Sequence, residues 1–235
     1  MQTIGLLGGM SWKSTLEYYR LINQEVQARL GGLNSAPLLL VSFNFAELVE
    51  LQEQNKRSEL ARIIGGGAYK LEEMGADLLL ICSNTMHMVA DELAAGKLPL
   101  FHIADALVAR MAGSKIKRLG LLGTSLTMEG DFYLGAIHRR KQMEILLPER
   151  EDRLLVNDII FQELCCGVVS AQSRKKLLKV CERLSDKGAQ AILLACTELP
   201  LLIKEGQLSV PVYNSMEIHA RAAVEIALTG GAGQR

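Results

Sequence analysis

Apolar and polar positions along the chain form short aliphatic runs separated by longer amphipathic stretches. The runs 78–81 and 191–194 are apolar at every position, which is typical of strands that are buried on both faces of a sheet. Between the runs, apolar residues recur at helical spacing over 13–30, 58–74, 153–166 and 173–187. This alternation predicts an α/β fold with mostly parallel sheets flanked by helices. The predicted strands cover 3–7, 36–42, 77–82, 98–102, 117–122, 143–147, 190–195 and 210–213.

The pattern occurs twice in the chain. Ile4-Gly-Leu-Leu-Gly8 recurs as Leu119-Gly-Leu-Leu-Gly123, and Leu98-Pro-Leu-Phe101 recurs as Val210-Pro-Val-Tyr213, in the same order. A solenoid would repeat at a period of roughly 20–50 residues, and this repeat is much longer. The sequence therefore predicts two similar, pseudo-symmetric domains, which cover 1–112 plus 212–235 and 113–211.

A third pair of segments sets the register of the repeat at a chemically important position. Gly75-Ala-Asp-Leu-Leu-Leu-Ile-Cys-Ser-Asn-Thr85 matches Gly188-Ala-Gln-Ala-Ile-Leu-Leu-Ala-Cys-Thr-Glu198, so Ser83 is paired with Cys196. A shift of one residue would pair Cys82 with Cys196, but it would break the shared Gly-Ala start. Cys82 is thus expected to be a buried packing residue, as free cysteines often are.

Polar residues follow the predicted strands at the ends where parallel sheets bind ligands. Ser83-Asn-Thr85 and Cys196-Thr-Glu198 follow matching strands, and Gly8-Gly-Met-Ser11 and Gly123-Thr-Ser125 follow the first strand of each repeat. If the two domains face each other, Ser83 and Cys196 would approach one pocket from opposite sides. Inversion of a stereocentre requires one group to remove a proton and another to return a proton to the opposite face. We therefore expect racemisation or epimerisation.

These segments resemble the aspartate/glutamate racemase family, whose cofactor-independent members carry a Cys-Asn-Thr motif in one domain and a Cys-Thr-Glu motif in the other. Ile4-Gly-Leu-Leu-Gly-Gly-Met10, Asn84-Thr-Met-His87 and Cys196-Thr-Glu198 carry the resemblance, which extends over essentially the whole chain. It implies two similar α/β domains with the active site between them, no pyridoxal phosphate or other cofactor, and a small acidic amino acid as substrate. It also implies a homodimer.

The resemblance and the strand-end positions together predict the site residues. Ser83 and Cys196 are the expected catalytic pair. The expected substrate-binding residues are Met10, Gln52, Asn84, Thr85, Thr124, Thr197 and Glu198. The Arg and Lys that bind substrate in some family members have no clear counterpart here, and Gln52 and Ser170 lie near those places.

The sequence departs from the two-cysteine pattern at Ser83. An alcohol is a much poorer base than a thiol, whose reference pKa is about 8.5. We therefore expect Cys196 to act as a thiolate base on one face of the substrate, while Ser83 donates a proton on the other face, directly or through a water. Ser83 could alternatively only cap the helix that begins near Thr85.

Other candidate residues also have structural interpretations. Met10 could pack its loop, Gln52 could be solvated, and the residues after the strands could be helix caps. His87, His102 and His219 lie close to predicted strand ends and could relay a proton, but they are expected to be structural histidines.

Composition excludes several other classes of protein. Lys and Arg together number 26, as do Asp and Glu, so no basic excess indicates nucleic acid or an anionic membrane surface as a partner. Trp12 rather than Gly precedes Lys13, which fails the P-loop pattern, and no GxGxxG is present. The five cysteines have no CxxC spacing, so neither a zinc site nor a disulfide framework is expected. With no signal peptide evident, the expected compartment is the cytoplasm.

The remaining alternatives are a single-cysteine enzyme, such as an arylmalonate decarboxylase-like or maleate isomerase-like protein, and a catalytically silent amino-acid-binding protein.

Overall fold

The computed structural model describes residues 1–93, 96–140 and 143–230, and the chain divides into two compact units. The first unit comprises Met1–Ala106 and His219–Arg235, and the second comprises Leu107–Ile218. The boundaries fall inside helices α5 (Ile103–Met111) and α10 (Ser215–Thr229). The boundaries that the sequence suggests, after residues 112 and 211, stay a prediction, and residues 231–235 lie outside the described residues.

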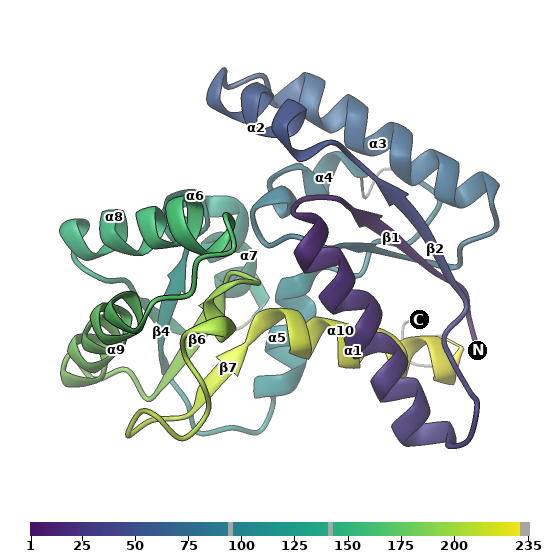
Figure 1. Ribbon diagram of the computed structural model, residues 1–235. Helices are drawn as coiled ribbons and strands as arrows, with labels where there is room; N and C mark the ends of the chain where they lie inside the picture. Colours follow the sequence, from purple (N-terminus) through teal and green to yellow (C-terminus); the bar gives the residue numbers. More distant parts are fainter. Residues whose placement is uncertain (94–95, 141–142, 231–235) are drawn as a thin grey trace. The chain divides into compact units, whose positions relative to one another are not determined.

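The first unit is built on a parallel sheet in which β1 (Ile4–Gly8) lies between β2 (Leu38–Ser42) and β3 (Leu78–Ile81). All residues of β1 and β3 are buried, as expected for strands that are apolar on both faces, whereas the edge strand β2 is only partly covered. Figure 1 shows α1 (Trp12–Leu30) and α3 (Arg57–Glu73) on opposite sides of these strands. The described residues of this unit also form α2 (Phe45–Glu53), the 3-10 turn η1 (Thr85–Val89) and α4 (Ala90–Leu93).

Side-chain caps explain where helices of this unit begin. Ser11 precedes α1 and accepts a hydrogen bond from the Ser14 N–H, and Asn44 precedes α2 and accepts one from the Ala46 N–H. Each cap follows a strand end by two or three residues, so each helix starts at the carboxyl edge of the sheet. The predicted helices 13–30 and 58–74 are confirmed within one residue at each end.

The second unit contains a parallel sheet of the order β5 (Glu144–Leu146), β4 (Arg118–Gly123), β6 (Ala191–Ala195) and β7 (Val212–Asn214). Strand β6 is buried along its whole length. The α/β fold with parallel sheets flanked by helices is therefore confirmed. The described residues of this unit also form α6 (Ser125–Glu129), α7 (Asp131–Arg140), α8 (Arg150–Asp158), η2 (Ile159–Leu164), α9 (Ala171–Asp186) and η3 (Leu199–Leu201).

The strand registers confirm the repeat and its alignment. Leu7 pairs with Ile81 in the first sheet, and its counterpart Leu122 pairs with Leu194 in the second. The residue after Ile81 is Cys82 and the residue after Leu194 is Ala195. Ser83 and Cys196 therefore occupy equivalent positions, two residues beyond the matched pairs.

Packing around the central strands repeats as well. Leu71 of α3 lies over Gly5 of β1, and Leu184 of α9 lies over Gly120 of β4, so close that a Cβ on either glycine would crowd the leucine. The two sheets are therefore covered by equivalent helices through equivalent contacts. Each of these contacts lies inside its own unit.

Two predicted elements differ from the structure. The predicted strand 98–102 is wrong, because only Leu100 bridges to Leu79 before the segment ends and α5 begins at Ile103. Pro99, which cannot donate to a ladder, contributes only its carbonyl, to the Leu79 N–H. The predicted helix 153–166 begins earlier, at Arg150, and its end widens into the π-helical segment η2, where the Cys165 N–H reaches the Ile160 carbonyl.

Candidate functional site

The polar residues of the first unit lie where its three parallel strands end. The Phe43 N–H donates to the Gly8 carbonyl, and the Cys82 N–H donates to the Leu7 carbonyl, so the chain leaves all three strands at one edge. Gly9 has a φ of 85°, and a Cβ there would lie 2.2 Å from the Phe43 carbonyl oxygen. Only glycine permits this close approach of the loops after β1 and β2.

Ser83 is buried on the loop between β3 and η1, with 8% of its surface exposed. Its Oγ accepts a hydrogen bond from the Met86 N–H at 3.4 Å, which agrees with a capping role, although the residue that directly precedes η1 is Asn84. A cap uses the oxygen lone pair and leaves the hydroxyl hydrogen able to donate to another group. Capping and proton donation are therefore compatible.

The other predicted residues of the first unit differ in burial and in position. Asn84 is buried and Thr85 is partly exposed, directly after Ser83. Met10 is only 3% exposed and belongs to the hydrophobic core cluster with Leu48 and Met86, which supports its packing interpretation. Gln52 is partly exposed near the C-terminal end of α2, whereas the strand ends lie near the N-terminal end of this helix. Contact of Met10 or Gln52 with a substrate stays a prediction.

The three histidines form a buried cluster in the first unit, and their hydrogen bonds define their tautomers. The Ile103 N–H donates to His87 Nε2 at 3.2 Å, so His87 Nδ1 carries the hydrogen that reaches the Ser83 carbonyl at 2.7 Å. His219 Nε2 lies 2.9 Å from the Phe101 carbonyl, and its Nδ1 accepts from the Tyr18 hydroxyl at 2.8 Å.

Burial keeps the rings of His87 and His219 neutral. Burial first, and then the neighbouring rings of His102 and His219, hold the pKa of His87 well below its usual range. Burial lowers the pKa of His219 to about 4. The expectation that these histidines are structural agrees with their backbone hydrogen bonds. The contact between His87 and Ser83 was not predicted from the sequence, although their spacing of four residues on a helical turn was the available signal.

In the second unit, Thr124 and Cys196 leave neighbouring strands at the same level, because Gly123 is paired with Ala195. Thr124 precedes α6 and its Oγ1 accepts a hydrogen bond from the Thr127 N–H at 3.3 Å. Thr197 is partly exposed, and Glu198 is 7% exposed. Apart from Gln52, the predicted residues of each unit therefore lie just after the strand ends of that unit's own sheet.

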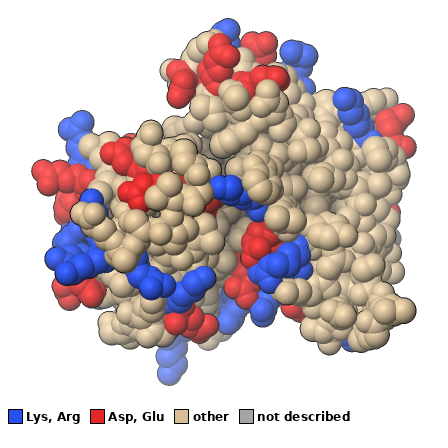
Figure 2. Space-filling view, viewed as in Figure 1, with Lys and Arg blue, Asp and Glu red and all other residues tan. Residues whose placement is uncertain are grey.

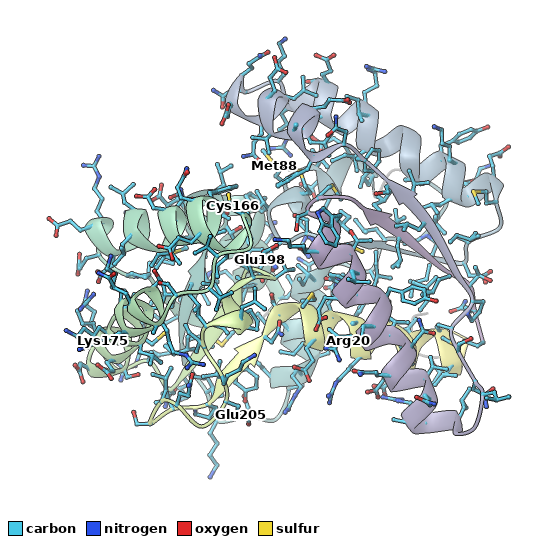
Figure 3. The ribbon with its side chains drawn as sticks, viewed as in Figure 1. Arg20, Met88, Cys166, Lys175, Glu198 and Glu205 are labelled. Carbon is cyan, nitrogen blue, oxygen red and sulfur yellow. The ribbon has the colours of Figure 1, made fainter. Side chains whose placement is uncertain are left out.

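Cys196 is buried, with 6% of its surface exposed, and its Sγ donates to Glu198 Oε2 at 3.2 Å. The Thr197 hydroxyl binds the same carboxylate oxygen. Figure 3 labels Glu198 on this loop. Burial first, and then the negative charge of Glu198, raise the pKa of Cys196 well above its usual value, while a backbone hydrogen bond from Glu198 acts in the opposite direction. The thiol is therefore the favoured form in this arrangement, and the action of Cys196 as a thiolate base stays a prediction.

Cys82 differs from Cys196 in both position and surroundings. It is completely buried beside β1, and burial raises the pKa of its thiol. Ser170, which the sequence analysis placed near a family lysine, caps α9 by accepting a hydrogen bond from the Ser173 N–H at 3.0 Å. Neither residue is arranged as a second base.

The described residues also bear on metal binding, membrane insertion and surface charge. Within residues 1–93, 96–140 and 143–230, no group of three His, Cys, Asp or Glu side chains could hold a metal ion. No helix in the described part of the chain is long and apolar enough to cross a membrane. Figure 2 shows acidic and basic side chains interspersed on the visible face.

Comparisons with known proteins agree with this arrangement. The Asp/Glu/Hydantoin racemase family model matches residues 7–223. The broad specificity amino-acid racemase RacX of Bacillus subtilis (strain 168) is 24% identical over 224 residues, which cover 94% of this chain and 96% of the relative. A crystal structure from Yersinia pestis, described as a candidate Asp/Glu racemase, is 44% identical, covers 97% of this chain and 100% of that chain, and has a TM-score of 0.92.

A crystal structure of an aspartate racemase homologue from Pyrococcus horikoshii OT3 is also similar. It is 32% identical, covers 97% of this chain and 100% of that chain, and has a TM-score of 0.83. Since the family model spans most of the chain and both structures match over nearly their whole length, the chain belongs to the Asp/Glu/Hydantoin racemase family and is an isomerase of the amino acid racemase type.

Proposed function

We propose that the protein is a cofactor-independent racemase that interconverts the L and D forms of aspartate and glutamate. In this proposal Cys196 and Ser83 exchange protons with the α-carbon from opposite faces. The observation that carries it is the strand register, which gives Ser83 and Cys196 equivalent positions at the ends of β3 and β6. Both side chains are buried proton carriers, and the family is one of racemases.

The contact between Cys196 and Glu198 suggests how the thiol becomes a base. At rest the thiol donates to the Glu198 carboxylate, and that charge helps to hold the proton on sulfur. The ammonium group of an amino acid placed beside Glu198 would offset the carboxylate charge and lower the pKa of the thiol. The thiol proton passes to Glu198 or to water, and the thiolate then removes the α-proton.

Ser83 acts as the proton donor on the other face. Its hydroxyl gives a proton to the planar carbanion, directly or through a water, and recovers a proton from water afterwards. The reverse step, removal of a proton by Ser83 or its water, is intrinsically slow because an alcohol seldom ionises. Asn84, Thr85, Thr124 and Thr197 supply amides and hydroxyls that suit the substrate carboxylates, with Met10 and Gln52 as further contacts.

Assembly and location complete the proposal. Trp12, Leu16 and Tyr19 are 64%, 59% and 56% exposed and lie along one side of α1, which supports a homodimer that covers apolar surface. Sedimentation velocity tests this assembly. The five cysteines all lie among the described residues and form no disulfide, which fits the reducing cytoplasm.

Deuterium exchange tests the proposed reaction. The purified protein is incubated with each enantiomer of aspartate and glutamate in deuterated water, and the α-deuterium content and the enantiomeric composition are measured. We expect exchange and inversion with at least one of the two amino acids. A binding protein would exchange nothing, and a decarboxylase would instead release carbon dioxide from an arylmalonate; either result would overturn the proposal.

A further inference from the structure

His87 is hydrogen-bonded at both ring nitrogens to backbone groups of different segments. Its Nδ1–H donates to the Ser83 carbonyl at 2.7 Å, and its Nε2 accepts from the Ile103 N–H at 3.2 Å. The ring thus bridges the loop after β3 and the start of α5. Only 1% of the residue surface is exposed, so neither bond has a ready substitute in water.

The hydrogen bond from His87 to the Ser83 carbonyl adds to the other hydrogen bonds that hold Ser83 and its neighbours in place. The Cys82 N–H donates to the Leu7 carbonyl at 2.9 Å, which ends the pairing between β3 and β1. Ser83 Oγ accepts from the Met86 N–H at 3.4 Å. Without His87, the Ser83 peptide would be held mainly by this long capping bond and by its neighbours in the chain.

We propose that His87 is a positioning residue that holds the Ser83 backbone, and with it the Ser83 hydroxyl, in the geometry needed for proton transfer. This inference rests on the proposed function of Ser83. Proton transfer depends steeply on placement, since a displacement of about 1 Å can cost about 100-fold in rate. His87 acts through Ser83 and does not itself exchange a proton with the substrate.

The surroundings of His87 keep the bond pattern in one form. The His102 ring centroid lies 4.5 Å away and that of His219 lies 5.8 Å away, both nearly edge-on. Both rings and burial disfavour a proton on His87, so Nε2 keeps its lone pair for the Ile103 N–H. The Nδ1–H tautomer is then required, and it directs its hydrogen to Ser83.

The other unit has no equivalent arrangement at the matching position. His87 follows Ser83 by four residues, and Pro200 follows Cys196 by four residues, so the counterpart of the imidazole is a side chain without a donor or acceptor. His102 and its counterpart in the repeat, Asn214, show that an Asn side chain can make a hydrogen bond in the place of a His Nδ1 in this fold. His102 Nδ1 accepts the Ala104 N–H at 3.0 Å, and at the equivalent position Asn214 Oδ1 accepts the Met216 N–H at 3.1 Å.

Two matched variants separate the bond to Ser83 from the bond to Ile103. In His87→Asn the amide nitrogen is attached to Cγ, as Nδ1 is, and can donate to the Ser83 carbonyl. In His87→Gln the amide group is one carbon further out, as Nε2 is, and can accept from the Ile103 N–H. Both replacements are polar and leave one of the two bonds unmade.

We expect His87→Gln to lower inversion about 10-fold to 100-fold, while α-proton exchange from the enantiomer that faces Cys196 stays within about threefold of the unmodified protein. His87→Asn should retain inversion within about threefold. Thermal unfolding of both variants shows whether each one folds. Equal losses in the two variants, or a parallel loss of exchange and inversion, would mean that His87 has only a structural role.

Two further measurements keep the inference testable. Ser83→Ala serves as the reference, because unchanged inversion in that variant would mean that the proposed function of Ser83 is wrong, and the positioning role would be wrong with it. Nitrogen-15 NMR of the histidine rings in the unmodified protein at neutral pH tests the geometry without any substitution. We expect His87 to be protonated at Nδ1 only, and protonation at Nε2 would contradict the bond to Ser83.

Discussion

The loop after β3 and the loop after β6 leave their sheets at equivalent positions, yet their polar surroundings differ in charge. Ser83 is contacted by neutral groups, the Met86 N–H and the His87 ring, whereas Cys196 donates to the carboxylate of Glu198. The same backbone register thus presents an alcohol held by uncharged donors in one unit and a thiol beside a negative charge in the other.

The difference shows that a repeated fold fixes where two proton carriers lie but does not make them chemically alike. Burial alone disfavours the thiolate, and the nearby carboxylate strengthens this effect at Cys196. At Ser83 the side chain itself is the limit, because an alcohol is a poor base in any of these surroundings. We therefore expect an enzyme whose two faces work with unequal ease, and the following experiments test this asymmetry.

The largest effect is expected from removing the thiol. Cys196→Ser should lower α-proton exchange from both enantiomers by about 1,000-fold or more, within the range for loss of an essential acid–base group, while circular dichroism shows an unchanged fold. Cys82→Ala is the matched control, because this buried thiol aligns with Ala195, and most activity should remain. Near-normal exchange in Cys196→Ser, or an equal loss in Cys82→Ala, would contradict the assignment.

Ser83→Ala should suppress inversion about 100-fold and reduce exchange much less, since Cys196 can still remove and return the same proton. Enantiomers have equal free energy, so kcat/KM for racemisation must be equal in both directions. The asymmetry therefore appears in the exchange-to-inversion ratio, which should be high for the enantiomer that faces Cys196 and close to one for its mirror image. Deuterium incorporation measured together with chiral chromatography gives both ratios.

Ser83→Cys sharpens the same comparison. With a thiol on each face, the two exchange-to-inversion ratios should become more similar and racemisation should become faster. Equal ratios for the two enantiomers in the unmodified protein would refute the asymmetric mechanism.

Acid should act first on the histidine cluster that supports the loop after β3. The pKa of His219 is lowered from its ordinary value of 6.5 to about 4 in the folded protein. Between these two pH values the unfolded chain therefore binds a proton at this residue more readily than the folded protein does. Stability should be fully retained above this range and should fall with decreasing pH inside it, by up to about 1.4 kcal/mol per pH unit for each such histidine. Urea unfolding between pH 4 and pH 7, a range of about three units, measures this slope.

The matched variant for the acid experiment is His219→Gln, which removes the titrating group. Its free energy of unfolding should be lower at neutral pH and should depend less on pH below 6.5, the ordinary pKa of histidine. An identical slope in the variant would show that other groups cause the acid sensitivity.

The smallest effect is expected at Glu198 in the substrate-free protein. Glu198→Gln removes the negative charge beside Cys196, so the pKa of the thiol should fall and its alkylation at a fixed pH should become severalfold faster. Mass spectrometry of the Cys196 peptide follows this reaction, with the buried Cys82 as an internal reference. Slower alkylation would mean that the carboxylate helps to remove the thiol proton more than its charge retains it.

Much of the fold could be predicted from the sequence. The apolar runs and helical spacing predicted the parallel strands and the helices α1, α3 and α9, because burial on both faces of a sheet demands such patterns. The internal repeat also predicted that Ser83, and not Cys82, is the counterpart of Cys196, and the strand registers confirm this alignment. The prediction of a strand over 98–102 was wrong, because the sequence does not show how soon an extended segment gives way to a helix.

Tertiary structure decided the chemistry around the site residues. Ser83 and Cys196 could be identified from their place in the repeat, but the donation from His87 to the Ser83 carbonyl, and the tautomer it requires, depend on the Ile103 N–H sixteen residues away. The protonated state of Cys196 depends on burial and on the direction in which the Glu198 carboxylate points. A sequence determines which groups can donate or accept protons, whereas desolvation and hydrogen-bond direction, which set the pKa, arise only when distant segments pack together.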